Sequence, residues 1–201
     1  MVNLRLPRQY SIYQDCFIIA KNLFLRHSGK KEKISGNRLC GYVVSTERAF
    51  ECIVESYCRS AAISLGYAHR AQATTPLARA ASGSELDYSI IPDDLVFTKD
   101  KKLIVDAKYK LLKNDGRLNK PSRDDFYQMI SSCIAQNAYE AVLVYPFSEG
   151  SRSNTWRIIE KVNGHNYIIR SAFVDVFGAE KALEDDMKKL ILKTSFYEVN
   201  A

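Results

Sequence analysis

The sequence predicts a single α/β domain, because segments with helical periodicity alternate with short apolar segments typical of strands. The chain has 201 residues, of which 46% are hydrophobic and 26% charged. This size and composition are typical of one well-packed globular domain. A predicted strand hairpin over residues 90–110 carries the three acids Asp93, Asp94 and Asp106 and the lysine Lys108 next to apolar strand residues, so it is the first place to look for function.

Four segments are predicted to be helical. Residues 10–27 place apolar side chains at i, i+3 and i+4 spacing, and residues 46–65 repeat this pattern before Gly66, which favours a helix end. Two further helices are expected over residues 126–140 and 179–193. We interpret residues 1–45 as an N-terminal helical segment and loop packed on the core, and residues 46–201 as the core itself.

The strands are predicted from short apolar segments bounded by turn residues. Beyond the hairpin at 90–110, residues 141–146 form a buried strand, and residues 155–161 and 166–177 form a second hairpin around Asn163 and Gly164. Residues 70–84 are small and polar, so they are expected to form a connection rather than an element.

The cellular compartment is predicted from two absences in the sequence. No stretch of 18 or more apolar residues occurs, and the N-terminus lacks the apolar core of a signal peptide. The five cysteines include no CxxC pair, which favours reduced thiols over a disulfide framework or a zinc site. We therefore expect a cytoplasmic protein without a membrane partner.

The positive charge of the chain is concentrated around the first hairpin. Residues 99–123 contain nine basic and three acidic side chains, a difference of +6 that equals the net charge of the whole chain. Such a segment suits a polyanionic partner, because lysine and arginine displace counterions from phosphates. A solvated lysine-rich turn remains an equal alternative on charge alone.

The acids of the hairpin are predicted to converge. If Lys99, Asp100 and Lys101 form a three-residue turn, Asp94 lies opposite Asp106, and Lys108 shares their face. A register shifted by one residue would bring Asp93 to this face instead. Because two opposed carboxylates repel, a divalent cation with oxygen ligands would stabilise them. The chemistry implied is phosphodiester hydrolysis, with Lys108 orienting the nucleophile or neutralising the phosphate.

At this point the residues resemble a known family. The sequence PDD, followed a dozen residues later by DAK, resembles the PD-(D/E)xK nuclease superfamily, and its context is similar to the McrC nuclease domain. RAFECIVESYC, DDLVF, IVDAKYK, FYQMISSCIA and AVLVYP occur in the same order as in that domain. The resemblance implies a restriction-endonuclease-like fold, with a central mixed β-sheet flanked by helices.

The resemblance also implies roles for individual residues. Asp94 and Asp106 would bind Mg²⁺, or Mn²⁺ in its place, together with the main-chain carbonyl of Ala107, and Lys108 would be the catalytic lysine. Glu51 would support the metal or its waters, and Gln128 would lie beside the site. Asp93 remains the alternative to Asp94. A separate set of basic residues is expected to follow the DNA backbone, namely Lys110, Lys113, Arg117, Lys120 and Arg123.

The function implied is a Mg²⁺-dependent DNA endonuclease, acting as the nuclease subunit of a restriction or phage-defence system. A repair or recombination nuclease and a non-catalytic nucleic-acid-binding subunit are the alternatives. The resemblance further implies a partner, either a McrB-like AAA+ motor or another recognition subunit. The chain itself has no Walker motif, so it is not expected to be that motor.

Overall fold

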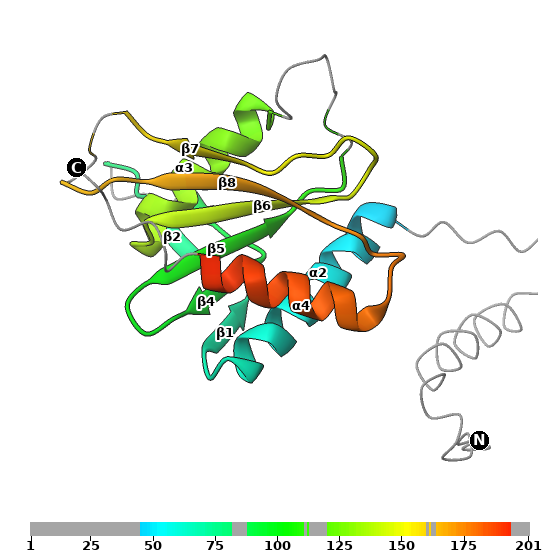
Figure 1. The fold of residues 1–201 in the computed structure, drawn as a ribbon. Helices are drawn as coiled ribbons and strands as arrows, with labels where there is room; N and C mark the ends of the chain where they lie inside the picture. The colour runs from blue at the N-terminus through cyan, green and yellow to red at the C-terminus, as the bar shows by residue number, and fades with distance from the viewer. Residues whose placement is uncertain are drawn as a thin grey trace, which may run out of the picture. The chain divides into compact units, whose positions relative to one another are not determined.

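A mixed β-sheet forms the centre of the domain in this computed structural model, which describes residues 45–81, 88–110, 112, 120–159, 161 and 164–193 (Figure 1). These residues fall within one compact unit, Val43–Ala201. The described elements, in chain order, are α2 (Thr46–Ser64), β1 (Ala68–Ala71), β2 (Thr75–Ala78), β3 (Tyr88–Ile90), β4 (Asp94–Phe97), β5 (Lys102–Ala107), α3 (Arg123–Gln136), β6 (Glu140–Pro146), β7 (Asn154–Arg157), β8 (Ile168–Val174) and α4 (Glu180–Leu192).

Within the described residues, six strands form the main sheet in the order β1-β4-β5-β6-β8-β7, and β2 and β3 form a small separate sheet. Strands β1, β4 and β5 are antiparallel neighbours, whereas β5, β6 and β8 run parallel and β7 returns antiparallel to β8. The central strand β6 is buried along almost its whole length, as expected for a parallel strand covered on both faces. The predicted α/β class with a mixed sheet is therefore confirmed.

Each face of the sheet is covered by helices, and each has its own apolar core. On one face, α2 and α4 pack together over a core that includes Phe50, Val54, Val96 and Met187. On the other face, α3 and the β2–β3 hairpin cover a core that includes Leu95, Ile104 and Met129. Alternate residues of β4 and β5 therefore point into different cores.

Local sequence explains where the two longer helices begin and end. The Ser45 hydroxyl accepts a hydrogen bond from the backbone N–H of Arg48 at 3.2 Å, and the Ser122 hydroxyl accepts one from Asp125 at 3.1 Å, so both helices have serine N-caps. Helix α3 ends at Asn137, which adopts the left-handed conformation at φ 49°. This early end leaves Glu140 free to begin β6, whereas the sequence predicted a helix continuing to residue 140.

Most predicted elements are confirmed within a few residues, including the long helix from Thr46, the strand around residues 141–146, both hairpins and the last helix. The prediction that residues 70–84 form only a connection is wrong, because β1 ends within this range and β2 lies inside it. The predicted helix at 10–27 lies outside the described residues, as does nearly all of the predicted N-terminal segment 1–45. None of the described helices is long and apolar enough to span a membrane.

The predicted register of the first hairpin is wrong by one residue. Thr98 and Lys101 form a hydrogen-bonded pair, in which the Thr98 N–H donates to the Lys101 carbonyl at 2.9 Å and the Thr98 hydroxyl accepts from the Lys101 N–H at 3.2 Å. The turn is therefore the two residues Lys99 and Asp100 rather than three. As a result, Asp94 pairs with Val105 and not with Asp106.

Candidate active site

The corrected register brings Asp93, not Asp94, to the face that carries Asp106. Asp93 lies just before β4, and its Oδ2 accepts a hydrogen bond from the backbone N–H of Ala107 at 2.9 Å. Its Oδ1 accepts a second hydrogen bond from Nε2 of Gln72 at 3.2 Å. The negative charge of Asp93 acts on both Asp106 and Lys108. Two carboxylates and a lysine thus converge at one end of the β4–β5 hairpin.

Asp106 and Lys108 form a close ion pair on this face. The Lys108 Nζ lies 2.6 Å from Oδ2 of Asp106, and the Asp106 side chain is only 2% exposed. Burial raises the pKa of Asp106 to about 6 despite the opposing charge of Lys108, and the charge of Asp93 adds to the rise. Burial alone would lower the pKa of Lys108, but Asp106 and the other nearby acids outweigh it, so the net shift is upward. Lys108 is therefore a positive charge at neutral pH and not a general base.

Asp93 has a raised pKa as well. Burial is the main cause, the charge of Glu51 adds to it, and the hydrogen bonds from Ala107 and Gln72 and the charge of Lys108 oppose it. Both acids are thus held in surroundings that penalise their negative charge. Burial is the largest cause for both acids, and Lys108 compensates part of their charge.

Asp94 points to the opposite face of the sheet. It is completely buried, and its Oδ1 lies 2.6 Å from Nε2 of His69 on β1. Burial raises the pKa of Asp94, and the interaction with His69 opposes that rise. Since Asp94 and Asp106 lie on different faces, the expected pair of Asp94 and Asp106 does not form, and the alternative that named Asp93 agrees with the geometry.

Glu51 and Gln128 differ in their relation to Asp93 and Asp106. Glu51 lies on α2, forms an ion pair with Arg48 at 2.9 Å, and is close enough for its charge to raise the pKa of Asp93. Gln128 is exposed on α3, one helical turn after Asp125. The charge of Asp125 raises the pKa of Asp106, so this flank of α3 faces the site. Glu51 is therefore close enough to act on Asp93, whereas Gln128 is an exposed residue of α3 with no hydrogen bond to the acids among the described residues.

The basic residues expected to bind DNA are only partly described. The Lys110 Nζ donates to both oxygens of Asp125, at 2.9 and 3.2 Å, while about half of its side chain stays exposed. Lys120 and Arg123 are exposed at the start of α3. Lys113 and Arg117 lie outside the described residues. Exposed basic side chains thus lie around the start of α3, and Lys110 is partly neutralised by Asp125.

Sequence reasoning missed two side chains that act on the acids, one through hydrogen bonds and one through its charge. Gln72 follows β1 in the left-handed conformation at φ 50°, which is uncommon for a residue other than glycine. Its backbone N–H donates to the Asp93 carbonyl at 2.9 Å, so the chain is tied to Asp93 through both backbone and side chain. Asp125, at the start of α3, is the second. Neither belongs to a recognisable motif, and only the strand that was not predicted places Gln72 here.

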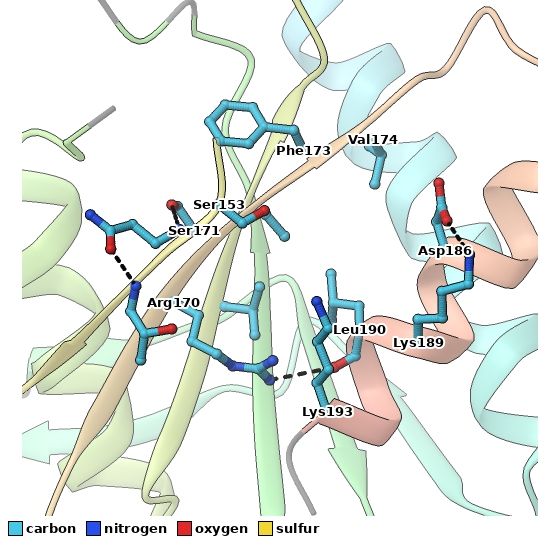
Figure 2. A pocket seen from close by; sticks show the side chains of 13 residues that line it. Ser153, Arg170, Ser171, Phe173, Val174, Asp186, Lys189, Leu190 and Lys193 are labelled. Carbon is cyan, nitrogen blue, oxygen red and sulfur yellow. Dashed lines mark hydrogen bonds and ion pairs between the residues drawn. The ribbon is translucent and has the colours of Figure 1, made fainter. Parts of the chain in front are cut away.

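A pocket of about 480 Å³ lies elsewhere, between β7, β8 and the end of α4 (Figure 2). The Arg170 guanidinium reaches across it to donate to the Leu190 carbonyl at 3.4 Å. Neither Asp93, Asp106 nor Lys108 lines this pocket. The chemically reactive groups and this hollow are therefore separate features of the domain.

Comparisons with known proteins give a family match and a fold match for this chain. The family model described as McrBC 5-methylcytosine restriction system component matches residues 1–146. A chain in the refined half-complex from the tetradecameric assembly of Thermococcus gammatolerans McrB AAA+ hexamers with bound McrC has a similar fold, with a TM-score of 0.58 and 17% identity. The match covers 95% of the present chain but only 40% of that chain. No curated protein matches significantly.

Proposed function

Because this chain belongs to the McrBC 5-methylcytosine restriction system component family, we propose that it is the nuclease subunit of such a system and cleaves DNA with a divalent cation. The observation that carries the proposal is the convergence of Asp93, Asp106 and Lys108 at the end of the β4–β5 hairpin. The family match supports the biological setting, and the side chains support the chemistry.

The residues present fit a magnesium ion. Mg²⁺ prefers oxygen ligands and is commonly bound by one or two carboxylates, with waters and phosphate oxygens completing its shell. Asp93 and Asp106 supply two carboxylates, and the carbonyl of Ala107 and a water held by Glu51 would supplement them. The pKa values of both acids are raised mainly by burial, and the charge of each acid also acts on the site, so a bound cation would favour their ionised forms. When bound, such an ion lowers the pKa of a coordinated water and stabilises negative charge on the attacked phosphate.

Other residues of the chain would orient the Asp93 carboxylate and act on the phosphate. The Ala107 N–H and the Gln72 amide fix the Asp93 carboxylate from two directions, so it is oriented before any ligand arrives. Lys108 remains protonated, so its role is to neutralise the phosphate and to orient the attacking water rather than to accept a proton. For Lys108 to contact the phosphate, its ion pair with Asp106 must break. The Asp106 carboxylate would then have a bound cation beside it in place of Lys108.

The surroundings suit a nucleic acid. Half-exposed Lys110 and exposed Lys120 and Arg123 lie near the start of α3, whose Asp125 is close enough to influence Asp106. Such side chains contact phosphates and position a duplex without reading its sequence. We therefore propose that target selection comes from a partner, and that an AAA+ motor like the McrB in the similar structure is the suitable candidate.

A cleavage assay tests the proposal. The purified chain, alone and with a cognate AAA+ protein and nucleotide, is incubated with methylated and unmethylated DNA and with RNA, in Mg²⁺ or in EDTA. We expect weak, poorly selective, Mg²⁺-dependent cleavage of DNA by the chain alone and stronger cleavage with the partner. DNA binding without cleavage under all of these conditions would favour a non-catalytic subunit instead.

A further inference from the structure

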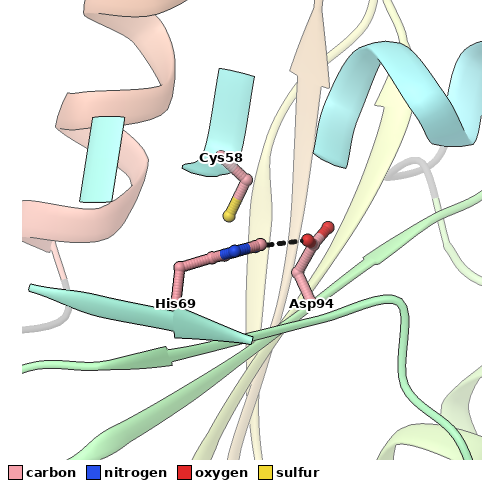
Figure 3. A group of neighbouring side chains, drawn as sticks. All are labelled: Cys58, His69 and Asp94. Atoms are coloured by element: carbon pink, nitrogen blue, oxygen red, sulfur yellow. Dashed lines mark hydrogen bonds and ion pairs between the residues drawn. The ribbon is translucent and has the colours of Figure 1, made fainter. Parts of the chain in front are cut away.

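A second cluster of metal-ligating side chains lies on the face of the sheet opposite the proposed active site. Cys58 of α2, His69 of β1 and Asp94 of β4 point toward one another (Figure 3). One ligand atom from each lies within 4.8 Å of the other two. Cys58 and Asp94 are fully buried, and the His69 side chain is only 4% exposed. This cluster is separate from Asp93, although Asp93 and Asp94 are neighbours in sequence.

One polar atom of the cluster lacks a partner. Asp94 Oδ1 interacts with His69 at 2.6 Å, but its buried Oδ2 has no hydrogen bond among the described residues. A buried carboxylate oxygen without a hydrogen bond is costly, and native proteins seldom leave one unless an ion or water completes it. This unpaired Oδ2 belongs to the Asp94 carboxylate, which also contacts the His69 imidazole and lies near the Cys58 thiol.

The charges around the cluster also favour a cation. Glu55 lies one helical turn before Cys58, and its charge raises the pKa values of both Cys58 and Asp94. Arg59 forms an ion pair with Glu55 on the exposed side of α2, where more than half of the arginine side chain meets solvent. The Cys58 thiol and the Asp94 carboxylate thus lie beside the His69 imidazole in a largely buried space, and the charge of Glu55 acts on the thiol and the carboxylate. A divalent ion would balance this set.

The ligand types indicate which kind of ion. Sulfur and imidazole nitrogen are poor ligands for Mg²⁺ but are preferred by Zn²⁺ and similar transition metals, which also accept a carboxylate. Ligand atoms around one tetrahedral zinc lie about 3–4 Å apart, given bond lengths of about 2.0–2.3 Å. Small side-chain adjustments would bring the three atoms to those separations. A water would fill the fourth position, and the thiol proton would leave to solvent on binding.

We propose that Cys58, His69 and Asp94 form a structural site for a zinc-type transition metal, which fastens α2 to strands β1 and β4. The elements joined are separated in sequence, and β1 is an edge strand of only four residues. A metal at this point would hold β1 against β4 and so support Gln72, which follows β1 and contacts Asp93. The site does not depend on the proposed nuclease activity.

Cobalt titration of the metal-free full chain tests this site, because Co²⁺ replaces Zn²⁺ and reports a thiolate ligand by charge-transfer absorption. We expect one equivalent of Co²⁺ to produce the sulfur-to-cobalt band and the strong visible bands of tetrahedral coordination, and Zn²⁺ to abolish both. Binding should also raise the Tm. Absence of the charge-transfer band in the folded wild-type chain overturns the proposal without reference to any variant.

Matched variants assign the ligands. Cys58→Ser should abolish the charge-transfer band, and Asp94→Asn and His69→Gln should each weaken Co²⁺ binding at least tenfold. Cys52→Ser, on the exposed side of the same helix, and Cys133→Ser, buried in the other core, should leave the band unchanged. Retention of the band in Cys58→Ser, or its loss in Cys133→Ser alone, overturns the assignment.

One further variant separates the two proposals. Asp93→Asn should retain the cobalt band with wild-type affinity, because its carboxylate lies on the other face of the sheet. Failure of the cobalt titration would leave Mg²⁺-dependent cleavage intact as a hypothesis. Loss of the band in Asp93→Asn would contradict the separation of the two faces.

Discussion

Asp93 and Asp94 are adjacent in the chain but lie in two different chemical environments. Asp93 is partly exposed and lies near Asp106 and Lys108. Asp94 is fully buried and belongs with His69 and Cys58 beneath α2. The pleat of a strand turns successive residues to opposite faces, so one step along the backbone separates Asp93, with Asp106, from Asp94, with His69 and Cys58.

The largest expected effect tests whether Asp106 belongs to the reactive face. Asp106→Ala should reduce Mg²⁺-dependent DNA cleavage by at least about a hundredfold, the scale on which a key electrostatic group acts. Single-turnover cleavage at saturating DNA would measure this, with circular dichroism to confirm folding. Wild-type rates for the folded variant would contradict the site.

The second prediction compares the neighbouring acids directly. Asp93→Asn should reduce cleavage by about a hundredfold, whereas Asp94→Asn should reduce it less than tenfold, because only Asp93 shares the face of Asp106. This order is the reverse of the one expected from a three-residue turn. The same single-turnover assay on both variants decides between them, and equal losses would show that the two faces are not functionally distinct.

The third prediction concerns the cost of holding Asp106 ionised. Its pKa is raised from 3.8 to about 6 in the folded protein. Between about pH 4 and pH 6 the folded state therefore retains a proton that the unfolded state has lost, and stability falls as the pH rises through this window. A pKa difference of about 2 corresponds to about 3 kcal/mol at most, at roughly 1.36 kcal/mol for each pKa unit.

Asp106→Asn should therefore stabilise the chain at pH 7.5 in EDTA, while removing cleavage in Mg²⁺. Urea unfolding at pH 4.5 and 7.5 measures the gain, which should be larger at the higher pH. Asp100→Asn, in the exposed turn of the same hairpin, is the matched control and should change stability little. An equal gain in the free energy of unfolding at both pH values would show that the pKa of Asp106 is not raised in the folded protein.

The smallest effect concerns DNA affinity on the two sides of the sheet. Lys120→Gln with Arg123→Gln should lower the slope of log affinity against log salt, by roughly 0.9 for each phosphate of duplex DNA that is no longer neutralised. Lys188→Gln with Lys189→Gln, on α4 over the other face, should leave it unchanged. Fluorescence anisotropy with several unrelated duplexes would measure both. Equal changes in slope would show that DNA has no preferred face.

The elements with strong apolar patterns were predictable from the sequence. Helix α2 and strands β5 and β6 bury most of their apolar residues, so their periodicity reports directly on packing. Strand β1 was missed because AHRA has neither alternation nor branched residues. Its pairing with β4 and the contact between His69 and Asp94 hold it in place, and both are tertiary interactions.

The residue types of the candidate site were predictable from the sequence, but the register between β4 and β5 was not. Asp106 and Lys108 follow from the DAK sequence, yet the choice between Asp93 and Asp94 depended on one residue of turn length. Lys99 and Asp100 carry no glycine or asparagine to identify a two-residue turn, and the Thr98 hydroxyl that helps to close it is a subtle signal. The length of the turn, closed by backbone and side-chain hydrogen bonds between Thr98 and Lys101, thus decides which acid faces Asp106.

The strand order also has a consequence for the time course of folding. Strands β4 and β5 pair across a two-residue turn, whereas β5 and β6 pair in parallel only after the intervening segment and α3 have crossed over. Tight hairpins close within microseconds, but parallel pairings with long sequence separation form slowly. Asp93 and Asp106 should therefore come together early in folding, when the β4–β5 hairpin forms. Pulsed hydrogen exchange should then show that the amides of β4 are protected before those of β8.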